Sequence, residues 1–242
     1  MEEWYNEMRR QFILNFINDN RWRFLLNGLW VTLRITFFAL LIGLAIGVVV
    51  AIVRSTYDKT ASVMKPGPGR FALGFFNGVC KIYLTVIRGT PVVVQLLIFY
   101  FIVLVSIQSG EFIGIIAFGI NAGAYTAEIF RSGIMSIDSG QFEAGRSLGF
   151  NYMQTMQYIV IPQAFKNILP TLANEFIVLL KETAVVGYVA VQDLTKAGDI
   201  IRGRTFSPFM PLIAVALVYL TIVMFFTKLV GILERRLRSS ER

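Results

Sequence analysis

The chain of 242 residues is 55% hydrophobic and 16% charged, with a mean hydropathy of +0.63, which is more apolar than an ordinary soluble domain. It has no histidine, which excludes histidine proton relays, histidine metal sites and imidazole-dependent triads, and its single cysteine, Cys80, excludes an intramolecular disulfide. The net charge of +8 comes from basic residues scattered at the ends of apolar runs, a pattern that indicates membrane topology and argues against a nucleic-acid partner.

Residues 1–26 are predicted to form a separate amphipathic segment. Its apolar stripe consists of Trp4, Met8, Phe12 and Phe16, with Ile13 and Ile17 beside them. Such a stripe on a charged helix predicts a helix lying in the membrane interface, on the extracytoplasmic side. A short helix that packs on the bundle with no special role is an equal alternative. Three glutamates precede any apolar run, which does not fit a secretory signal peptide, so the first span is expected to act as the insertion signal.

The rest of the chain predicts an all-α integral membrane protein with five transmembrane helices. We expect these spans near residues 36–53, 91–107, 112–130, 168–191 and 208–227, each close to the length needed to cross ~30 Å of hydrocarbon. Residues 71–88 carry Lys81 and Arg88 and are expected to lie near the interface. Gly43 and Gly47 form a G-x-x-x-G pair, which predicts a close helix–helix approach. The transmembrane domain would cover residues 27–231, followed by a basic tail, 232–242.

The lysine and arginine counts predict the orientation of these spans. With five crossings, one side would carry 14 basic residues and the other 7, with Arg34 and Lys181 inside spans. Because basic residues accumulate in cytoplasmic loops, the N-terminus is expected outside and the C-terminus in the cytoplasm.

A polar stretch, residues 141–170, interrupts the apolar runs on the expected cytoplasmic side. Asp138 and Gln141 have the spacing of a helix N-cap with a reciprocal partner, and Gly149 predicts a helix stop. Pro162 and Pro170 are expected to break the chain again. So short a helix is unstable alone, which predicts that it docks on something. On composition alone, a re-entry loop with solvated polar residues is an alternative of similar weight.

The run Glu143-Ala144-Gly145, three residues, Gly149, nine residues, then Ile159-Val160-Ile161-Pro162 resembles the EAA motif of ATP-binding-cassette importer permeases. Gly145 stands where alanine is usual, and Ile161 where leucine is usual. Residues 88–96, 123–134 and 179–189 resemble the polar amino-acid branch of that family, the histidine, glutamine, arginine and glutamate type. The resemblance extends over about residues 27–231.

The resemblance implies the type I importer transmembrane fold in a bacterial cell membrane, in a transporter subunit that is not itself an enzyme. The loop helix would be a coupling helix that contacts an ATPase through Glu143, Ala144, Gly145 and Gly149. Expected partners are a dimer of ATP-binding subunits, an extracytoplasmic solute-binding protein and a second permease copy, identical or related. The chain lacks a G-x-x-x-x-G-K-[ST] run, so ATP and Mg would bind the partner ATPase, with no cofactor in this chain.

Polar residues inside the expected spans are candidates for binding an amino-acid substrate, because such residues are costly in lipid. They are Gln95, Asn121, Tyr125, Glu128, Asn174, Glu175, Lys181 and Glu182. A helix break near residues 183–187 would add backbone donors and acceptors.

Each candidate also has a structural interpretation. Glu128 and Arg131 have the i, i+3 spacing of an ion pair, which we favour for them. Lys181 and Glu182 could equally pair with a neighbouring helix, and Tyr125 could be packing. No specific amino acid is favoured.

Two other classes of function stay open at this point. An ATP-independent carrier or channel would be favoured if the loop helix were dispensable, although five spans without an internal repeat are few for a carrier. A membrane enzyme would need a nucleophile–base pair or a metal cluster that the sequence does not offer.

Overall fold

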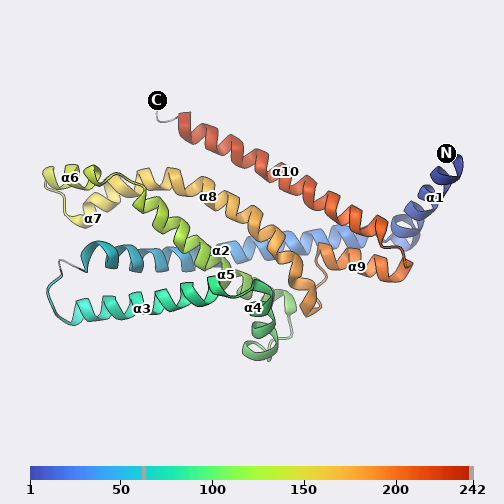
Figure 1. Ribbon diagram of the computed structural model, residues 1–242, viewed down its shortest axis with the longest axis horizontal. Helices are drawn as coiled ribbons and strands as arrows, with labels where there is room; N and C mark the ends of the chain where they lie inside the picture. Colours follow the sequence, from blue (N-terminus) through green and yellow to red (C-terminus); the bar gives the residue numbers. More distant parts are fainter. Residues whose placement is uncertain (62–63, 240–242) are drawn as a thin grey trace. The chain divides into compact units, whose positions relative to one another are not determined.

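The computed structural model describes residues 1–61 and 64–239, and within these ranges the regular structure is entirely helical (Figure 1). The chain divides into two compact units. Unit one contains Met1–Ala39, Val92–Phe118 and Ile177–Lys228. Unit two contains Leu40–Pro91, Gly119–Phe176 and Leu229–Arg242.

Among the described residues, four helices are long and apolar enough to cross a membrane. These are α2 (Trp22–Thr60), α3 (Pro68–Gly89), α5 (Gly110–Met135) and α10 (Phe209–Ser239), of which Phe209–Leu237 forms the candidate span. α2 and α5 contain the predicted spans at 36–53 and 112–130, and α10 contains all of the predicted span at 208–227 except Pro208. The expected basic tail from residue 232 continues α10 up to Ser239, and residues 240–242 lie outside the described part.

The predicted span at residues 91–107 is wrong, and the expected interfacial position of residues 71–88 is not confirmed. α3 is itself a candidate span of 22 residues, although it carries Lys81 and Arg88. Arg88 lies in its last turn, where its guanidinium approaches Glu128 of α5. The expected span at 91–107 is instead a shorter apolar helix, α4 (Val92–Ile98), that continues as the π-turn η3 (Phe99–Val103).

α8 (Ile161–Glu182) replaces the expected span at 168–191. It is not among the four apolar candidates because its polar residues lower its hydropathy, so length and composition do not give the expected count of five. Pro162 and Pro170 were expected to break the chain, which is also wrong. Pro162 follows a π-turn at Met156–Val160 within an uninterrupted helical run, and Pro170 lies inside α8.

Close packing of α2 on α5 holds unit two together. An added Cβ at Gly43 would lie 2.8 Å from the Cβ of Ala122, and one at Gly47 would lie 2.6 Å from Cγ2 of Thr126. Real Cβ atoms do not come so near, so both glycines permit the approach of the two backbones. The close helix–helix approach predicted from G-x-x-x-G is confirmed.

The N-terminal helix of unit one is shorter than the sequence suggests. α1 (Glu2–Phe12) continues as the π-turn η1 (Ile13–Ile17) and the 3-10 turn η2 (Asn18–Asn20) before α2 begins. Asn15 is fully buried, where its amide donates to Oγ of Ser207 and its oxygen accepts from Thr205, so η1 is attached to the end of α9 (Leu194–Thr205).

Candidate functional site

A short helix, α6 (Ser139–Ser147), lies in the polar stretch of unit two. It begins at Asp138, whose Oδ1 accepts a 2.6 Å hydrogen bond from the backbone N–H of Gly140, so the predicted N-cap is confirmed. The predicted reciprocal contact from Gln141 is wrong. The Gln141 side chain instead accepts a 3.3 Å hydrogen bond from Gln163, which ties the start of α6 to α8.

Gly149 ends this helix, as predicted. Its φ of +79° lies in the left-handed region, which glycine adopts without strain. The N–H of Gly149 donates to the carbonyl of Arg146 at 2.9 Å, and the N–H of Phe150 donates to that of Gly145 at 3.0 Å. These two bonds form a Schellman motif, which satisfies the last carbonyls of α6. Both ends of the helix are therefore fixed locally.

A second cap, absent from our sequence analysis, fixes the chain directly after α6. α7 (Tyr152–Thr155) begins with a complete capping box, in which the side chains of Asn151 and Gln154 each bond the backbone N–H of the other at 2.9 Å. The N-x-x-Q spacing was visible in the sequence. The π-turn η4 (Met156–Val160) then leads into α8.

The inner face of α6 packs against α7, and the two lie side by side (Figure 1). Gly145 is buried there, and a Cβ at this position would lie 2.6 Å from Oγ1 and 2.7 Å from Cγ2 of Thr155. Glycine at 145, where the resemblance expects alanine, is therefore matched to the threonine opposite. The substitution is not merely a tolerated change of size.

The outer face of the α6–α7 hairpin is exposed. Glu143 and Ala144 are both exposed on α6. Leu148 and Met153, whose side chains are 71% and 69% exposed, add apolar area to the same loop. Large exposed apolar side chains on a locally rigid loop are typical of a protein contact surface.

A cavity of about 370 Å³ lies beside α6 within unit two. Its lining residues come from the end of α2 and from the loop: Lys59, Thr60, Ser139, Phe142, Glu143, Arg146, Tyr152 and Thr155. The Lys59 ammonium lies 4.6 Å from the centre of the Phe142 ring, a cation–π distance. Burial raises the pKa of Tyr152, so its phenol stays protonated at neutral pH. The contact between Lys59 and Phe142 joins α6 to α2.

Glu128 forms the ion pair that its spacing predicts. Its carboxylate accepts a 2.6 Å hydrogen bond from Nη2 of Arg131, and Arg88 of α3 lies 3.9 Å away. The Arg88 guanidinium also lies 5.7 Å from the ring of Tyr125. The structure thus brings Tyr125 and Glu128 together around one arginine. The sequence analysis placed Arg88 in an interfacial segment and did not predict this contact, which joins residues 40 positions apart.

The other candidates divide between the two units. Gln95, Lys181 and Glu182 belong to unit one, whereas Asn121, Asn174 and Glu175 belong to unit two with Tyr125 and Glu128. Gln95 and Asn121 are buried, Glu175 and Glu182 are half-buried, and Asn174 and Lys181 are exposed. The Asn174 amide donates to the carbonyl of Pro170 in its own helix.

The predicted helix break after Glu182 is present in unit one. The chain continues as a 3-10 helix, η5 (Thr183–Val189), and the Thr183 hydroxyl lies 3.4 Å from that of Thr36. The fully buried Asp193 then caps α9 by accepting from the backbone N–H groups of Thr195 and Lys196. Burial raises the pKa of Asp193, and these backbone hydrogen bonds oppose the shift.

Comparison with known proteins gives a consistent result. Residues 67–239 match the family described as binding-protein-dependent transport system inner membrane component. A putative glutamine transport system permease protein, GlnP, of Rickettsia bellii is 36% identical over 217 residues, covering 88% of this chain and 93% of that protein. The arginine transport system permease protein ArtQ of Bacillus subtilis is 35% identical over 221 residues, covering 90% and 94%.

A solved structure agrees with these relatives. The crystal structure of an amino acid ABC transporter with histidines superposes with a TM-score of 0.78 at 39% identity, covering 88% of this chain and 94% of that one. The family match spans more than half of the chain, and the relatives align over nearly all of it. The chain therefore belongs to the family of binding-protein-dependent transport system inner membrane components.

Proposed function

We propose that this chain is the membrane-spanning subunit of an ATP-driven importer of polar amino acids. The names of the relatives support the substrate class, since they include glutamine and arginine permeases and an amino acid ABC transporter. The proposed assembly contains two permease subunits, identical or related, two ATP-binding subunits that hold ATP and Mg, and an extracytoplasmic solute-binding protein. The chain itself carries no catalytic role in this proposal.

The observation that carries the proposal is the construction of α6. A helix of nine residues is unstable alone, yet α6 is capped at both ends and packed on one face, while its opposite face is exposed. We infer that Glu143 and Ala144 contact a groove of the ATPase, while Gly145 and Gly149 give the helix its fit and its end. Closure of the ATPase dimer on ATP would then move α6, and hydrolysis would release it.

The proposed topology has five crossings: α2, α3, α5, α8 and α10. α8 is polar for a span, but polar side chains in lipid normally face the interior of a bundle. With α3 crossing in place of residues 91–107, the basic residues divide twelve against seven, with Arg34, Lys81, Arg88 and Lys181 inside spans. The larger number is again on the side of the C-terminus. The N-terminus is therefore proposed outside, with residues 1–26 as an interfacial segment, 27–231 as the transmembrane domain and 232–242 as a cytoplasmic tail.

For the substrate path we retain the intramembrane polar residues as candidates and favour Asn121 and Glu175. A zwitterionic amino acid needs acceptors for its ammonium and donors for its carboxylate. Glu175 lies half-buried in the polar helix α8. Glu128 forms ion pairs with Arg88 and Arg131. We therefore expect Glu128 to act mainly in structure. Gln95, Tyr125, Asn174, Lys181 and Glu182 remain secondary candidates, and the broken segment η5 could add backbone groups.

Uptake into proteoliposomes tests the function. We expect the chain, reconstituted with its ATPase and binding protein, to accumulate labelled glutamine or arginine only when ATP is supplied. ADP or a non-hydrolysable nucleotide should reduce uptake to the background of empty vesicles. Transport that persists without the ATPase would instead support an ATP-independent carrier.

Substitution of Gly145 tests the docking role of α6. Gly145→Ala places a methyl group against Thr155, and overpacking of this kind costs about 1–3 kcal/mol. We expect the affinity of the permease for its ATPase to fall about tenfold, measured by co-purification and titration. Thr155→Ala removes Oγ1 and Cγ2, the two atoms nearest to the added methyl group. The double variant Gly145→Ala with Thr155→Ala should therefore recover most of the affinity for the ATPase.

Gly78→Ala is a matched control, because a Cβ there meets nothing within 4 Å, and it should leave ATPase binding unchanged. A double variant as weak as Gly145→Ala alone would show that the contact with Thr155 is not the reason for glycine at this position. Full ATPase affinity in Gly145→Ala itself would contradict the docking role.

Replacement of Glu175 tests the substrate path. Glu175→Gln keeps the shape and removes the charge, so a lost charge-assisted hydrogen bond should raise the KM for uptake about tenfold with ATPase binding unchanged. Glu128→Gln, by contrast, should lower thermal stability with little change in KM, because it disrupts the contacts with Arg88 and Arg131. Unchanged uptake kinetics in Glu175→Gln would remove this residue from the path.

A further inference from the structure

A groove between the end of α2 and the start of α3 has no role in the proposed transport function. Its volume is about 490 Å³. Among its lining residues Arg70 is the only charged one, and the others are aromatic residues, glycines and a proline: Tyr57, Pro66, Gly67, Phe71, Gly74 and Phe75. All of them belong to unit two, so the geometry of the groove is local to one compact unit.

The groove lies just beyond the cytoplasmic end of the apolar run of α2. Residues 36–53 carry no charge, and Arg54 follows them. Nη1 of Arg54 donates a 2.9 Å hydrogen bond to Oδ1 of Asn77 in α3, so these two residues lie at the same depth. Phe75 and Arg70 precede Asn77 by two and seven residues, which places them about 3 Å and about 10 Å further from the hydrocarbon. This range of depth corresponds to the lipid headgroup layer.

Large aromatic rings are exposed at this depth. The side chains of Phe71, Phe75 and Phe76 are 79%, 60% and 57% exposed. The rings of Phe75 and Phe76 pack edge to face, with their centres 5.7 Å apart. An exposed apolar patch of this kind marks a surface that contacts protein or membrane. At the edge of the hydrocarbon, contact with lipid removes these rings from water directly.

The polar end of the groove carries positive charge that no carboxylate neutralises. Arg70 is exposed, and its Nη1 donates a 3.3 Å hydrogen bond to the carbonyl of Met64, but it makes no ion pair with any residue in the described part of the chain. Residues 54–70 contain four basic residues and one acidic residue, Asp58. Asp58 interacts with Arg131 of α5 and does not line the groove. The guanidinium of Arg70 therefore keeps most of its donors available.

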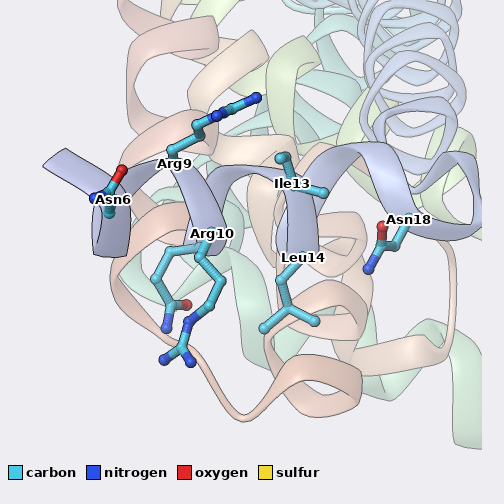
Figure 2. Close-up of a pocket in the computed structure, with 7 residues that line it drawn as sticks. Asn6, Arg9, Arg10, Ile13, Leu14 and Asn18 are labelled. Atoms are coloured by element: carbon cyan, nitrogen blue, oxygen red, sulfur yellow. The ribbon is translucent and has the colours of Figure 1, made fainter.

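The pocket along α1 and η1, with a similar volume of about 500 Å³, lacks this arrangement. Figure 2 shows the side chains of Arg9 and Arg10 on opposite sides of the helix. Arg10 also pairs with Glu7 at 2.9 Å. The two arginines therefore do not converge on one anion, whereas Arg70 lines the same groove as the aromatic rings.

We propose that the groove between α2 and α3 binds an anionic phospholipid of the cytoplasmic leaflet. The guanidinium of Arg70 matches the phosphate oxygens in charge and geometry. Tyr57, Phe71 and Phe75 contact the glycerol backbone and the upper acyl chains. Gly74 leaves room between them, because a Cβ there would meet only Cε2 of Tyr57, at 3.8 Å.

Two other occupants fit the groove less well. A free anion would use Arg70 and leave the aromatic rings in water. A zwitterionic lipid carries its own cation beside the phosphate, so it gains less from the arginine. The choice of leaflet follows from the proposed orientation of the chain. The inference depends neither on which solute is transported nor on the ATPase, so its failure would leave the proposed transport function untouched.

A single tryptophan in the groove provides the test. Trp4→Phe, Trp22→Phe and Trp30→Phe remove the three tryptophans of the chain, and Phe71→Trp adds one to the wall of the groove. The full chain would be reconstituted in nanodiscs of phosphatidylcholine. A small share of the lipid would be phosphatidylglycerol, or phosphatidylcholine, brominated near the top of its acyl chains. Quenching of the tryptophan fluorescence then measures the enrichment of each brominated lipid at the groove.

We expect phosphatidylglycerol to be enriched about fivefold over phosphatidylcholine, since one basic residue near an anionic lipid surface contributes about that factor. Arg70→Gln should reduce this ratio to about one. Lys65→Gln is the matched control, because it makes a similar charge change at an exposed residue outside the lining and should leave the ratio near its original value.

A second pair of variants changes the shape of the groove without changing its charge. Gly74→Leu fills the groove and should also reduce the ratio to about one. Gly78→Leu lies one turn further along α3, outside the lining, where a Cβ meets nothing within 4 Å, and it should leave the ratio unchanged. Because Arg70 and Gly78 are not buried, these variants should keep the helical content of the parent, which circular dichroism would verify.

Four outcomes would overturn the proposal. An unchanged ratio in Arg70→Gln would show that the arginine does not select the lipid. A loss in Lys65→Gln as large as in Arg70→Gln would assign the effect to the general surface charge. Loss of the enrichment in millimolar inorganic phosphate at constant ionic strength would assign the groove to a free anion. Loss of the enrichment when the ATPase is added would assign it to a protein contact.

Discussion

Backbone N–H and C=O groups in lipid must be paired within the protein, and this requirement decides where the chain is helical and where it can stop. Long apolar helices satisfy it directly, as in α2, α3, α5 and α10. The more demanding places are those where a helix ends. In unit one the chain leaves α8 through a 3-10 segment, and the buried Asp193 satisfies the first N–H groups of α9. In unit two the polar loop contains its own caps at Asp138, Gly149 and Asn151.

The same caps make α6 suitable for transmitting force. Its backbone is fixed at both ends, Gly145 packs on Thr155, and Lys59 lies over Phe142 at the end of α2. A push on the exposed face of α6 would therefore be passed to α2, α7 and α8 within unit two and would not be lost in a flexible loop. The hydrogen bond between Gln141 and Gln163 provides a further connection to α8. This is the physical content of the proposed coupling role.

Much of this arrangement could be predicted from the sequence because it depends on local rules. Apolar length predicts three of the spans, G-x-x-x-G predicts the contact of α2 with α5, and Asp138 and Gly149 predict the ends of α6. The errors have a common origin, because charged residues and prolines were interpreted without the residues that surround them in the structure. Lys81 and Arg88 suggested an interfacial segment, and Pro170 suggested a break, yet α3 and α8 are continuous helices.

Pairings between distant residues could not be obtained from a single sequence. Arg88 approaches Glu128 and Tyr125 from another helix, and Gly145 meets Thr155 across a turn. The contact of Gly145 with Thr155 also changes how this position of the EAA motif is interpreted. A glycine that looked like a conservative replacement for alanine is matched to the threonine opposite it. The capping box at Asn151 and Gln154 is different, since its spacing was present in the sequence and could have been found.

The most direct test of the coupling role is crosslinking from α6 in the assembled transporter. Cys80 is the only cysteine, so a Cys80→Ser background with Ala144→Cys carries one attachment point for a photo-activated crosslinker. If α6 binds in a groove of the ATPase, the crosslinker should capture the ATPase in high yield. The crosslinked positions on the ATPase, or the yield, should differ between the nucleotide-free and the ATP-bound states. A position 144 that reacts freely with water-soluble thiol reagents in the intact, transporting complex and captures no ATPase would contradict the docking of α6.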